Sequence, residues 1–523
     1  MPIAQDRLSI VVGVTGHRDV APEDEAPLRG TFARVLAQLQ HACPHSPLLV
    51  LSGLATGADS LAAEEAIERG IPVIACLPMP VEEYEKDFTP AQLERFRKLL
   101  AACARTTVTS PTRDGGYVAT GRFIAKYSHL LVAFWDTQTS RGAGGTADVI
   151  EMRLGEKQAS AADIEAMEYL PDVGPVDIIV TPRQSATRPT DPYSLTRTYP
   201  KDLAPDSASA YFTVILTRID TYNADLARTR VSNAQGGIEG LMECTDAAAN
   251  RLQRRTNFFQ MILLICAFFA AAVQVIGIFN PMFKVAALAV AFAAYGLARR
   301  NDYENRYQDY RAIAEGLRVQ AAWYCAGLTH RLVDSAYLRM QASELQWIRL
   351  ALRFFYLLYC EDRVFADASY EHPVCQDWVR SQWEYYGRAG RRAARLKGRL
   401  DRISSLALAL GVACSIVFGV LYYAVHLRTA LTVNLVTVPF VMAAVLKALF
   451  THYDEKQNLA GNARRYERMF GIFERARRNL QEIARGGAGD PVEILFDLGR
   501  AALAEHADWL LMRRDRPLRV VIL

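Results

Sequence analysis

The stretch Leu51–Pro80, LSGLATGADSLAAEEAIERGIPVIACLPMP, decides the fold of the N-terminal part of the chain. It reads as the end of an apolar strand, a loop marked by glycines, a helix, and a second apolar strand. This order of segments predicts a βαβ unit, in which the two strands lie parallel and the helix crosses between them.

Apolar runs of the same kind recur on both sides of this unit. The predicted strands are Leu8–Val14, Leu48–Gly53, Ile71–Leu77, His129–Trp135 and Val176–Val180. Each run is short, apolar and rich in β-branched residues, which is typical of strands covered on both faces in a parallel sheet. Helical patterns separate them at Pro27–His41, Asp59–Arg69, Pro90–Ala104, Gly121–Tyr127 and from Thr146 onward. Residues 8–182 are therefore predicted to form a doubly wound α/β domain with a parallel sheet.

The composition of the chain argues against several classes of protein. The chain has 523 residues, of which 51% are hydrophobic, and its formal net charge is only +4. So small a net charge gives no support for a nucleic-acid partner. The nine cysteines show no Cys-x-x-Cys spacing, which argues against a zinc site and suits a reducing compartment. No metal or cofactor is expected, and the short, interrupted N-terminal apolar run does not predict a signal peptide.

Four longer apolar segments follow a proline-rich linker, predicted at 183–206, and lead-in helices, predicted at 207–257. These segments are Phe258–Phe279, Met282–Ala298, Leu406–Val425 and Ala430–Phe450. A membrane span needs about 20 largely apolar residues. The segments therefore predict an all-α membrane region with four transmembrane helices in two hairpins, at 258–298 and 403–450, separated by a helical region at 299–402 and followed by a helical tail at 451–523. Buried helices of a soluble protein are the alternative.

Basic residues flank both predicted hairpins on the side away from the short connectors. They are Arg251, Arg254, Arg255, Arg299, Arg300, Arg391, Arg392, Arg395, Lys397, Arg399 and Arg402, whereas the connectors carry only Arg428. Positively charged flanks tend to stay in the cytoplasm. The sequence thus predicts a multi-pass protein of a bacterial inner membrane with the α/β domain and both termini in the cytoplasm.

The first of three loops that follow predicted strands is VTGHRD, Val14–Asp19. Such loops lie at the edge where open α/β sheets bind ligands. Thr15 and Gly16 favour a tight turn, and His17 and Arg18 are suited to donate charge-assisted hydrogen bonds to phosphate. An ordinary strand-to-loop turn is the alternative.

The two other loops each lead directly into a predicted helix. Small residues let a ligand approach the backbone, and a helix N-terminus carries a partial positive charge that attracts anions. Asp59 taken alone is also explained as the cap of its helix. Three loops of this kind on one sheet edge predict a phosphate-bearing ligand. The residues concerned are Ser52, Gly53, Thr56, Gly57 and Asp59 in the second loop, and Gly144, Gly145 and Thr146 in the third.

The segments VGVTGHRD, SGLATGADSLAAEEAIERGIPVIACLP and SHLLVAFWD…GAGGTADVI resemble the SLOG superfamily, relatives of the DNA-processing protein DprA and of the LOG phosphoribohydrolases. The membrane half looks like the transmembrane effector modules associated with SLOG domains. The resemblance implies a sensor of a nucleotide signal, of the cyclic-nucleotide or ADP-ribose type, whose hairpins act on the membrane in bacterial anti-phage defence. It assigns the ligand's phosphates to Gly13, Thr15, Gly16, Gly53, Thr56, Gly57, Gly144, Gly145 and Thr146, and polar contacts at the two helix starts to Asp59 and Asp148.

One departure from the LOG enzymes bears on catalysis. The LOG enzymes share a Pro-Gly-Gly-x-Gly-Thr-x-x-Glu motif whose glutamate assists cleavage of a glycosidic bond. The corresponding stretch of this chain, residues 142–151, is GAGGTADVIE. Because a general acid has to lie within hydrogen-bond reach of its target, the changed loop favours binding over hydrolysis. If the protein is an enzyme, a membrane-anchored nucleoside-phosphate hydrolase of LOG type, then Asp148 or Glu151 is the predicted catalytic carboxylate.

The favoured hypothesis is a ligand-gated membrane effector that acts as a homo-oligomer. A nucleotide signal binds the α/β domain, and the hairpins open a pore or disrupt the lipid bilayer. A genetic association with a synthase of that signal follows from this hypothesis. Gln260, Gln274, Asn434 and Lys447 are candidates for lining a pore, or for hydrogen bonds between helices. A transporter is disfavoured because the spans contain almost no paired charges.

Overall fold

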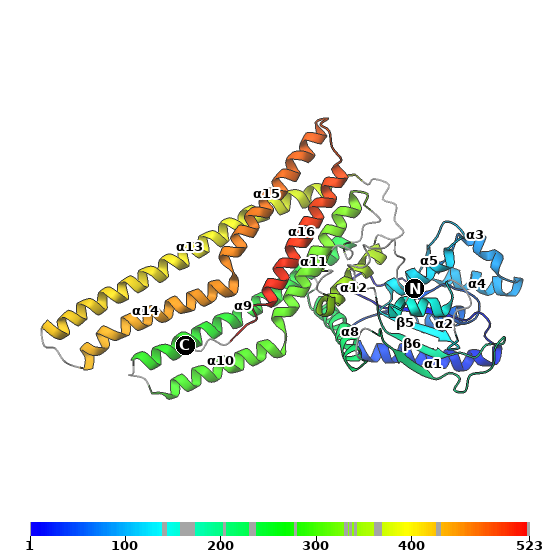
Figure 1. The fold of residues 1–523 in the computed structure, drawn as a ribbon, viewed down its shortest axis with the longest axis horizontal. Helices are drawn as coiled ribbons and strands as arrows, with labels where there is room; N and C mark the ends of the chain where they lie inside the picture. Colours follow the sequence, from blue (N-terminus) through cyan, green and yellow to red (C-terminus); the bar gives the residue numbers. More distant parts are fainter. Residues whose placement is uncertain are drawn as a thin grey trace. The chain divides into compact units, whose positions relative to one another are not determined.

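The computed structural model describes residues 2–138, 144–156, 173–201, 205–229, 237–276, 280–328, 333, 337–338, 342–359, 369–424 and 430–519. The chain divides into two compact units. The first comprises Met1–Cys244 and Thr329–Val364, and the second comprises Thr245–Leu328 and Phe365–Leu523. The first contains all the β-strands and the second is helical (Figure 1).

The α/β unit is built on one seven-stranded sheet of order β4-β3-β2-β1-β5-β6-β7. All neighbouring strands run parallel except the antiparallel pair β6 and β7. Because the order reverses direction at β1, the carboxyl ends of β1 and β5 flank the switch point of the sheet. The strands are β1 (Ile10–Gly16), β2 (Leu48–Ser52), β3 (Val73–Leu77), β4 (Arg105–Val108), β5 (Leu130–Trp135), β6 (Val176–Val180) and β7 (Leu195–Thr198).

Helices cover both faces of the sheet, as a doubly wound fold requires. One group of helices packs side by side: α1 (Pro22–Ala42), α2 (Ala58–Glu68) and α4 (Pro90–Ala102). The second group is α5 (Gly116–Tyr127) with α6 (Thr146–Leu154), and the short α3 (Val81–Tyr84) lies between β3 and α4. Strands β1, β2, β3 and β5 are continuously buried, which explains their unbroken apolar sequences.

Two further helices from distant parts of the sequence complete this unit. They are α8 (Pro205–Ala227) and α12 (Ala342–Tyr359), which pack against each other, and α12 also contacts α5. The buried Asn223 side chain of α8 pairs with the backbone of Leu8, with distances of 2.9 and 2.8 Å. From α12, Arg353 donates a hydrogen bond of 2.8 Å to the carbonyl of Lys126, in the last turn of α5. The segment 329–364 therefore returns the chain to the α/β unit.

The predicted α/β architecture with a parallel sheet is confirmed, with two strands that were not predicted. β4, with the sequence RTTV, and β7, with the sequence LTRT, are polar edge strands without an apolar run to reveal them. β7 also makes the sheet mixed rather than wholly parallel. It lies within the predicted linker 183–206, so the sheet extends beyond the predicted domain end at residue 182. Helix α5 begins at Gly116 rather than at Gly121.

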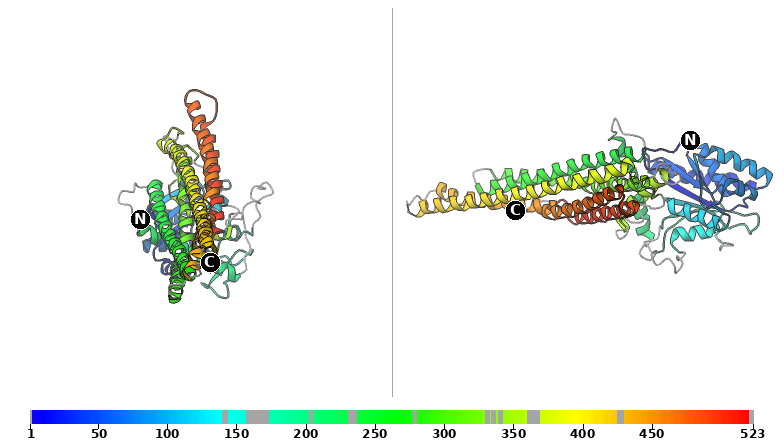
Figure 2. Two further views of the ribbon diagram at one scale, coloured as in Figure 1. Left: turned by 90° about the vertical axis from the view of Figure 1, so that its left-hand side faces the viewer. Right: turned by 90° about the horizontal axis from the view of Figure 1, so that it is seen from above.

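The helical unit contains two pairs of long apolar helices. α9 (Ile238–Ile276) precedes α10 (Met282–Arg300), and α13 (Pro373–Ala424) precedes α14 (Ala430–Gln457). Three other helices join or follow these pairs: α11 (Tyr303–Cys325), α15 (Leu459–Ala484) and α16 (Pro491–Arg514). α13 lies beside α14 along one part of its length and beside α15 along another (Figure 1, Figure 2). α16 packs against α11 and α15.

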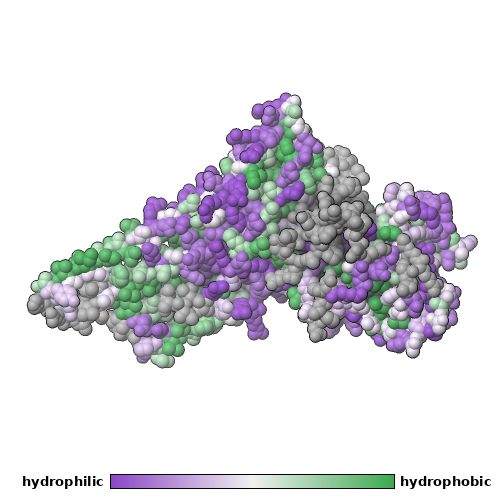
Figure 3. Space-filling view, viewed as in Figure 1, coloured by the Kyte–Doolittle hydropathy of each residue, from purple (hydrophilic) through white to green (hydrophobic). Residues whose placement is uncertain are grey.

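Within the part of the chain that the structure describes, three helical stretches are long and apolar enough to cross a membrane, namely Ile238–Val275, Met282–Cys325 and Pro373–Ala424. They contain the first three predicted spans, apart from residues 276–279 and 425, of which 277–279 and 425 lie outside the described residues. The fourth predicted span, 430–450, falls in α14, of which the side chains of residues 430–436 lie outside the description. Large apolar side chains point outward along these helices: Phe258, Met282, Leu406, Leu410 and Ile416 are each more than 60% exposed. Hydrophobic residues accordingly cover the C-terminal part of α13 in Figure 3, while hydrophilic residues predominate over α15.

Candidate functional site

A cavity of the α/β unit lies where the carboxyl ends of β1 and β5 meet. Its volume is about 520 Å³, within the range of small-molecule sites. It coincides with the switch point at which open α/β sheets bind ligands. The described lining residues come from the ends of β1 and β5, from the loops after β1, β2, β3 and β5, from α2, α3 and α5, from the start of α6, and from the segment after β6. They are Val14, Thr15, Gly16, His17, Arg18, Asp19, Gly53, Ala55, Asp59, Pro78, Tyr84, Tyr117, Thr120, Gly121, Ile124, Trp135, Asp136, Gln138, Gly144, Gly145, Thr146, Ala147, Val149 and Arg183.

Arg18 supplies a cation to this cavity. Its guanidinium lies 4.9 Å from the ring centroid of Tyr117, a favourable cation–π distance. Burial lowers the pKa of Arg18, but Tyr117, Tyr84 and Asp59 together raise it by more. The pKa therefore lies above its ordinary value, and the guanidinium stays charged. Within the described residues no carboxylate oxygen lies within 4.0 Å of it. Arg18 is therefore placed to pair with an anionic ligand.

His17 is held in one orientation by Asp136. The backbone N–H of Asp136 donates to His17 Nε2 at 3.0 Å, and the Asp136 carboxylate lies 3.1 Å from the same nitrogen. Burial lowers the pKa of His17, so the ring is neutral at pH 7. A neutral imidazole has one N–H donor and one acceptor nitrogen. His17 is therefore a hydrogen-bonding group of the cavity rather than a second cation.

A charge network supports this arrangement from the wall of the cavity. Arg183 lies 2.8 Å from Asp19 and 3.3 Å from Asp136, and Ser185 donates a hydrogen bond to Asp19. Although burial raises the pKa of Asp136, the Gln138 backbone N–H, His17 and Arg183 lower it below its ordinary value. Both carboxylates are therefore ionised and occupied by Arg183, which is why they do not oppose an anion at Arg18.

Asp59 is a different kind of carboxylate. It is only 8% exposed, and its Oδ1 atom has no hydrogen-bond partner in the described part of the chain. Burial raises the pKa of Asp59 to about 7, against the opposing effects of Arg18 and of the backbone N–H groups of Ala55 and Gly16. A buried oxygen without a partner costs free energy. Asp59 is thus suited to accept a hydrogen bond from a ligand, or to donate one when protonated.

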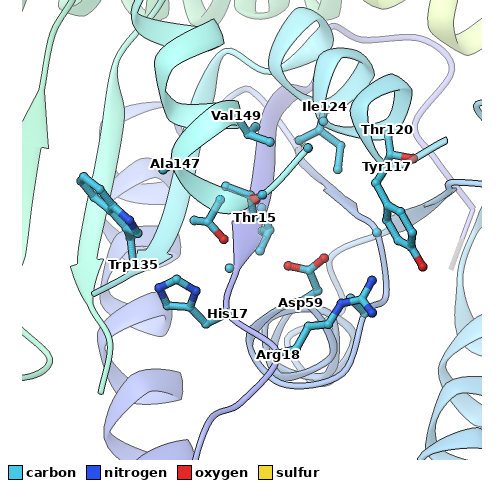
Figure 4. A pocket seen from close by; sticks show the side chains of 18 of the residues that line it. Thr15, His17, Arg18, Asp59, Tyr117, Thr120, Ile124, Trp135, Ala147 and Val149 are labelled. Carbon is cyan, nitrogen blue, oxygen red and sulfur yellow. The ribbon is translucent and has the colours of Figure 1, made fainter. Parts of the chain in front are cut away.

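Aromatic side chains form two opposite sides of the cavity. Figure 4 shows Trp135 and His17 on one side and Tyr117 and Thr120 on the other, with Asp59 and Arg18 between them. The Trp135 indole N–H donates to the carbonyl of Gln138 at 2.9 Å, which fixes the ring. Deeper in the unit, the Tyr84 hydroxyl donates to the carbonyl of Gly53 at 3.1 Å. Trp135 and Tyr117 are only partly buried and offer apolar faces to a planar ligand group.

The N-terminus of α6 meets the cavity at Gly144, Gly145 and Thr146. Asp148, one turn into the helix, accepts a hydrogen bond from the Gly144 N–H at 2.7 Å and so closes this loop. Residues 139–143, in the predicted third loop, lie outside the described residues. Among those described, no group of three or more His, Cys, Asp or Glu side chains is arranged to hold a metal ion.

The structure brings most of the predicted ligand residues together. Thr15, Gly16, His17, Arg18, Gly53, Asp59, Gly144, Gly145 and Thr146 line the cavity. Of the other predicted residues, Gly13 lies against the end of α5, since a Cβ there would lie 2.8 Å from Ile124 Cγ2 and 2.0 Å from Oγ of Ser128, the residue after the helix. The Ser52 hydroxyl donates to the carbonyl of Asp59, in the first turn of α2, at 3.0 Å. Gly13, Ser52, Thr56, Gly57, Asp148 and Glu151 are absent from the described lining.

Several lining residues were not predicted from the sequence, chiefly Tyr84, Tyr117, Trp135, Asp136 and Arg183. Trp135 and Asp136 end a predicted strand, so the strand-end rule that identified His17 and Arg18 also applied to them. Tyr117 and Arg183 carried no such signal, because one lies in the first turn of a helix and the other in a proline-rich segment.

Opposite pKa changes at His17 are expected from two substitutions in its surroundings. Asp136→Asn removes a charge that raises the pKa of His17, and Arg183→Met removes one that lowers it. The first variant should therefore lower the pKa of His17 and the second should raise it. NMR titration of ¹³C-labelled histidine measures both. Arg188→Met is the control, because Arg188 pairs with Asp24 at 2.8 Å instead; equal shifts in all three variants would refute the network.

Comparison with known proteins matches one segment of the chain to a family. Residues 242–330 match the family described as "Protein of unknown function (DUF4231)". The match spans nearly all of α9 together with α10 and α11, covers less than half of the chain, and includes none of the cavity residues. A search of the curated proteins found no matching sequence. The SLOG-like character of residues 8–182 stays a prediction.

Proposed function

We propose that the α/β unit binds a phosphate-bearing, nucleotide-derived signal in the cavity between β1 and β5, and that the helical unit converts binding into a membrane event. The observation that carries this proposal is the arrangement around Arg18. One cavity at the switch point of the sheet is lined by Arg18, by a neutral His17 and by the N-terminus of α6. Among the described residues, the Arg18 guanidinium has no carboxylate partner within 4.0 Å. Donors of this kind suit phosphate, and Tyr117 and Trp135 supply faces for a base.

The membrane part of the proposal has four spans in two hairpins. The basic flanks favour a topology with both termini and the α/β unit in the cytoplasm of a bacterium and the hairpins in the inner membrane. Gln260 bonds Gln457 at 2.9 Å, and Gln274 bonds Lys284 at the same distance, so both favour contacts between helices over a pore lining. The effector forms homo-oligomers that open a pore or disrupt the bilayer, in anti-phage defence, with the signal made by an associated synthase.

A second candidate, a nucleoside-phosphate hydrolase, is favoured by one observation only. Asp59 is a cavity carboxyl whose burial raises its pKa to about 7, and such a group is suited to protonate a leaving group. In this candidate Asp59 is the catalytic carboxylate in the cavity, whereas Asp148 and Glu151, which were also predicted for this role, lie outside its described lining. The hairpins would then serve as an anchor.

The test uses the full chain in lipid nanodiscs and in dye-loaded liposomes. Cyclic nucleotides, ADP-ribose and cyclic ADP-ribose are added, and thermal stability, nucleotide integrity and dye release are followed. A ligand at 100 times its Kd should stabilise the fold by about 2.7 kcal/mol. We expect stabilisation, intact nucleotide and dye release. Arg18→Gln should abolish all responses, whereas Arg34→Gln, at an exposed arginine of α1, should preserve them. Consumption of the nucleotide without dye release would favour the hydrolase, and no stabilisation by any nucleotide would refute both.

A further inference from the structure

The C-terminal end of α16 and the residues after it contact both hairpins of the helical unit. We call the segment Arg513–Arg519 the strap. It comprises the last two residues of α16 and five residues that continue without regular secondary structure. In Figure 1 the chain leaves α16 and runs back beside α9 and α10. Its contacts come from elements far apart in the sequence.

On one side the strap contacts the first hairpin. The Leu518 side chain packs against a buried cluster that α9 and α10 share, made of Leu263, Cys266, Ala291 and Ala294. The backbone N–H of Leu518 donates to the carboxylate of Glu304 at 2.8 Å. Glu304 lies in the first turn of α11, directly after the first hairpin. One residue of the strap is thus attached to both helices of this hairpin and to the helix that follows.

On the other side the strap contacts the end of the second hairpin. Arg516 donates a hydrogen bond of 2.7 Å to the carbonyl of Glu455, and Arg513 donates to the side chain of Gln457 at 3.1 Å. Glu455 and Gln457 lie in the last turn of α14. Because these contacts are made to backbone and side chain together, they fix the strap in register on α14.

Lys456 of α14 contacts both the strap and α11, the helix that follows the first hairpin. This lysine, between Glu455 and Gln457, is only 8% exposed. Its ammonium group donates both to the Glu304 carboxylate and to the carbonyl of Arg516. Losing Glu304 would leave a buried cation without its carboxylate, which is strongly unfavourable. The Lys456–Glu304 pair and the strap therefore depend on each other.

Polar groups around the strap are incompletely satisfied. Gln457 donates to Gln260 of α9 at 2.9 Å, yet the Nε2 atom of Gln260 is buried without a hydrogen-bond partner among the described residues. A contact region with an unsatisfied buried amide stores unfavourable free energy that another arrangement can relieve. The site that joins the hairpins is thus suited to change state.

We propose that the strap fastens the two hairpins to each other in a closed arrangement, and that its release permits them to rearrange in the bilayer. This inference rests on the proposed membrane function, and it adds a restraint between the hairpins that this function does not by itself require. It makes Glu304 the anchor, because this one carboxylate holds both the strap backbone and Lys456. Loss of the anchor should produce the membrane event without any nucleotide.

The test compares Glu304→Gln with Glu493→Gln, a matched change at an exposed glutamate of α16, in the full chain in liposomes. The first readout is structural. Leu518→Cys is added to each, oxidised with copper phenanthroline, and its disulfide with Cys266 is identified by mass spectrometry. We expect this disulfide in the wild-type and Glu493→Gln backgrounds, and a yield at least fivefold lower with Glu304→Gln. An equal yield in all three would overturn the strap.

The second readout is dye release without nucleotide, in the same variants without the added cysteine. We expect release at least tenfold faster with Glu304→Gln than with Glu493→Gln. Release from Glu304→Gln while the wild type never responds to a nucleotide would support the strap and refute the sensor. No release from Glu304→Gln would overturn the strap as a restraint, whether or not the wild type responds to nucleotides.

Discussion

Replacing Asp59 with asparagine should make the protein progressively more stable than the wild type as the pH rises. Burial raises the pKa of Asp59 from 3.8 to about 7 in the folded protein. At any pH between these two pKa values, Asp59 is protonated in the folded state and ionised in the unfolded state. The free energy of unfolding of the wild type therefore falls as the pH rises through this range. Asparagine does not titrate, so the Asp59→Asn variant does not undergo this fall in stability.

The size of the effect follows from the shift. Each pKa unit corresponds to about 1.4 kcal/mol, so the difference between Asp59→Asn and wild type should widen by up to about 4 kcal/mol between pH 4 and pH 8. Thermal unfolding of the α/β unit should show a relative change on the order of 10 °C. Any constant difference between the two side chains cancels, because only the change with pH is compared.

The control for this experiment is Glu94→Gln, at an exposed carboxylate of α4. Its stability should follow that of the wild type at every pH. Parallel stability curves for Asp59→Asn and wild type would show that Asp59 is ionised throughout, and the interpretation of the cavity as holding a proton on a buried carboxyl would then be wrong.

The second large effect is expected from Gly57→Ala. Gly57 precedes α2 with φ +83° and ψ −126°, a backbone conformation that residues with a side chain rarely adopt. A Cβ there would lie 2.5 Å from the carbonyl oxygen of His17 and 2.6 Å from that of Arg18. These are backbone atoms, and the Ala58 N–H also holds the carbonyl of His17 at 3.0 Å. The loop after β1 therefore has to move to admit a methyl group.

Strain of this kind costs about 1–3 kcal/mol and overpacking a similar amount. Gly57→Ala should thus destabilise the α/β unit by about 4 kcal/mol, and ligand binding should be lost because His17 and Arg18 are displaced. Thermal unfolding and nucleotide binding measure the two effects. Gly115→Ala separates the causes, because Gly115 has φ +70° but a Cβ there would meet no described atom within 4 Å. It should cost only about 1–2 kcal/mol, and an equal loss at both positions would contradict the steric argument.

The parallel sheet was predictable because its central strands have a distinctive sequence. β1, β2, β3 and β5 are buried on both faces, so their sequences are continuously apolar and bounded by turns. β4 and β7 lie at the edges of the sheet, where partial exposure permits threonine and arginine. No run of apolar residues marks them, and only pairing with β3 or β6 reveals them.

The candidate site was predictable only where function coincides with glycine-marked loops. The loops after β1 and β5 and that before α2 supply His17, Arg18, Gly144 and Asp59 to the cavity. Arg183 was missed because prolines around it predicted a linker, whereas its ion pairs to Asp19 and Asp136 hold that segment on the domain. Gly57 was predicted as a ligand contact; it lies outside the described lining of the cavity, and its φ of +83° lets the loop after β1 lie close to the start of α2.

The return of α12 to the α/β unit has a consequence for how the protein is made. This helix, with Arg353 bonded to the end of α5, belongs to a unit whose sheet is complete at Thr198. The ribosome must add on the order of 150 more residues, including the whole first hairpin, before α12 emerges, which takes roughly 10 s or more at ordinary rates of synthesis. During that interval the nascent α/β unit lacks its last helix while α9 and α10 are already leaving the ribosome. In the proposed membrane topology, the first hairpin would therefore enter the bilayer before the domain encoded ahead of it is complete.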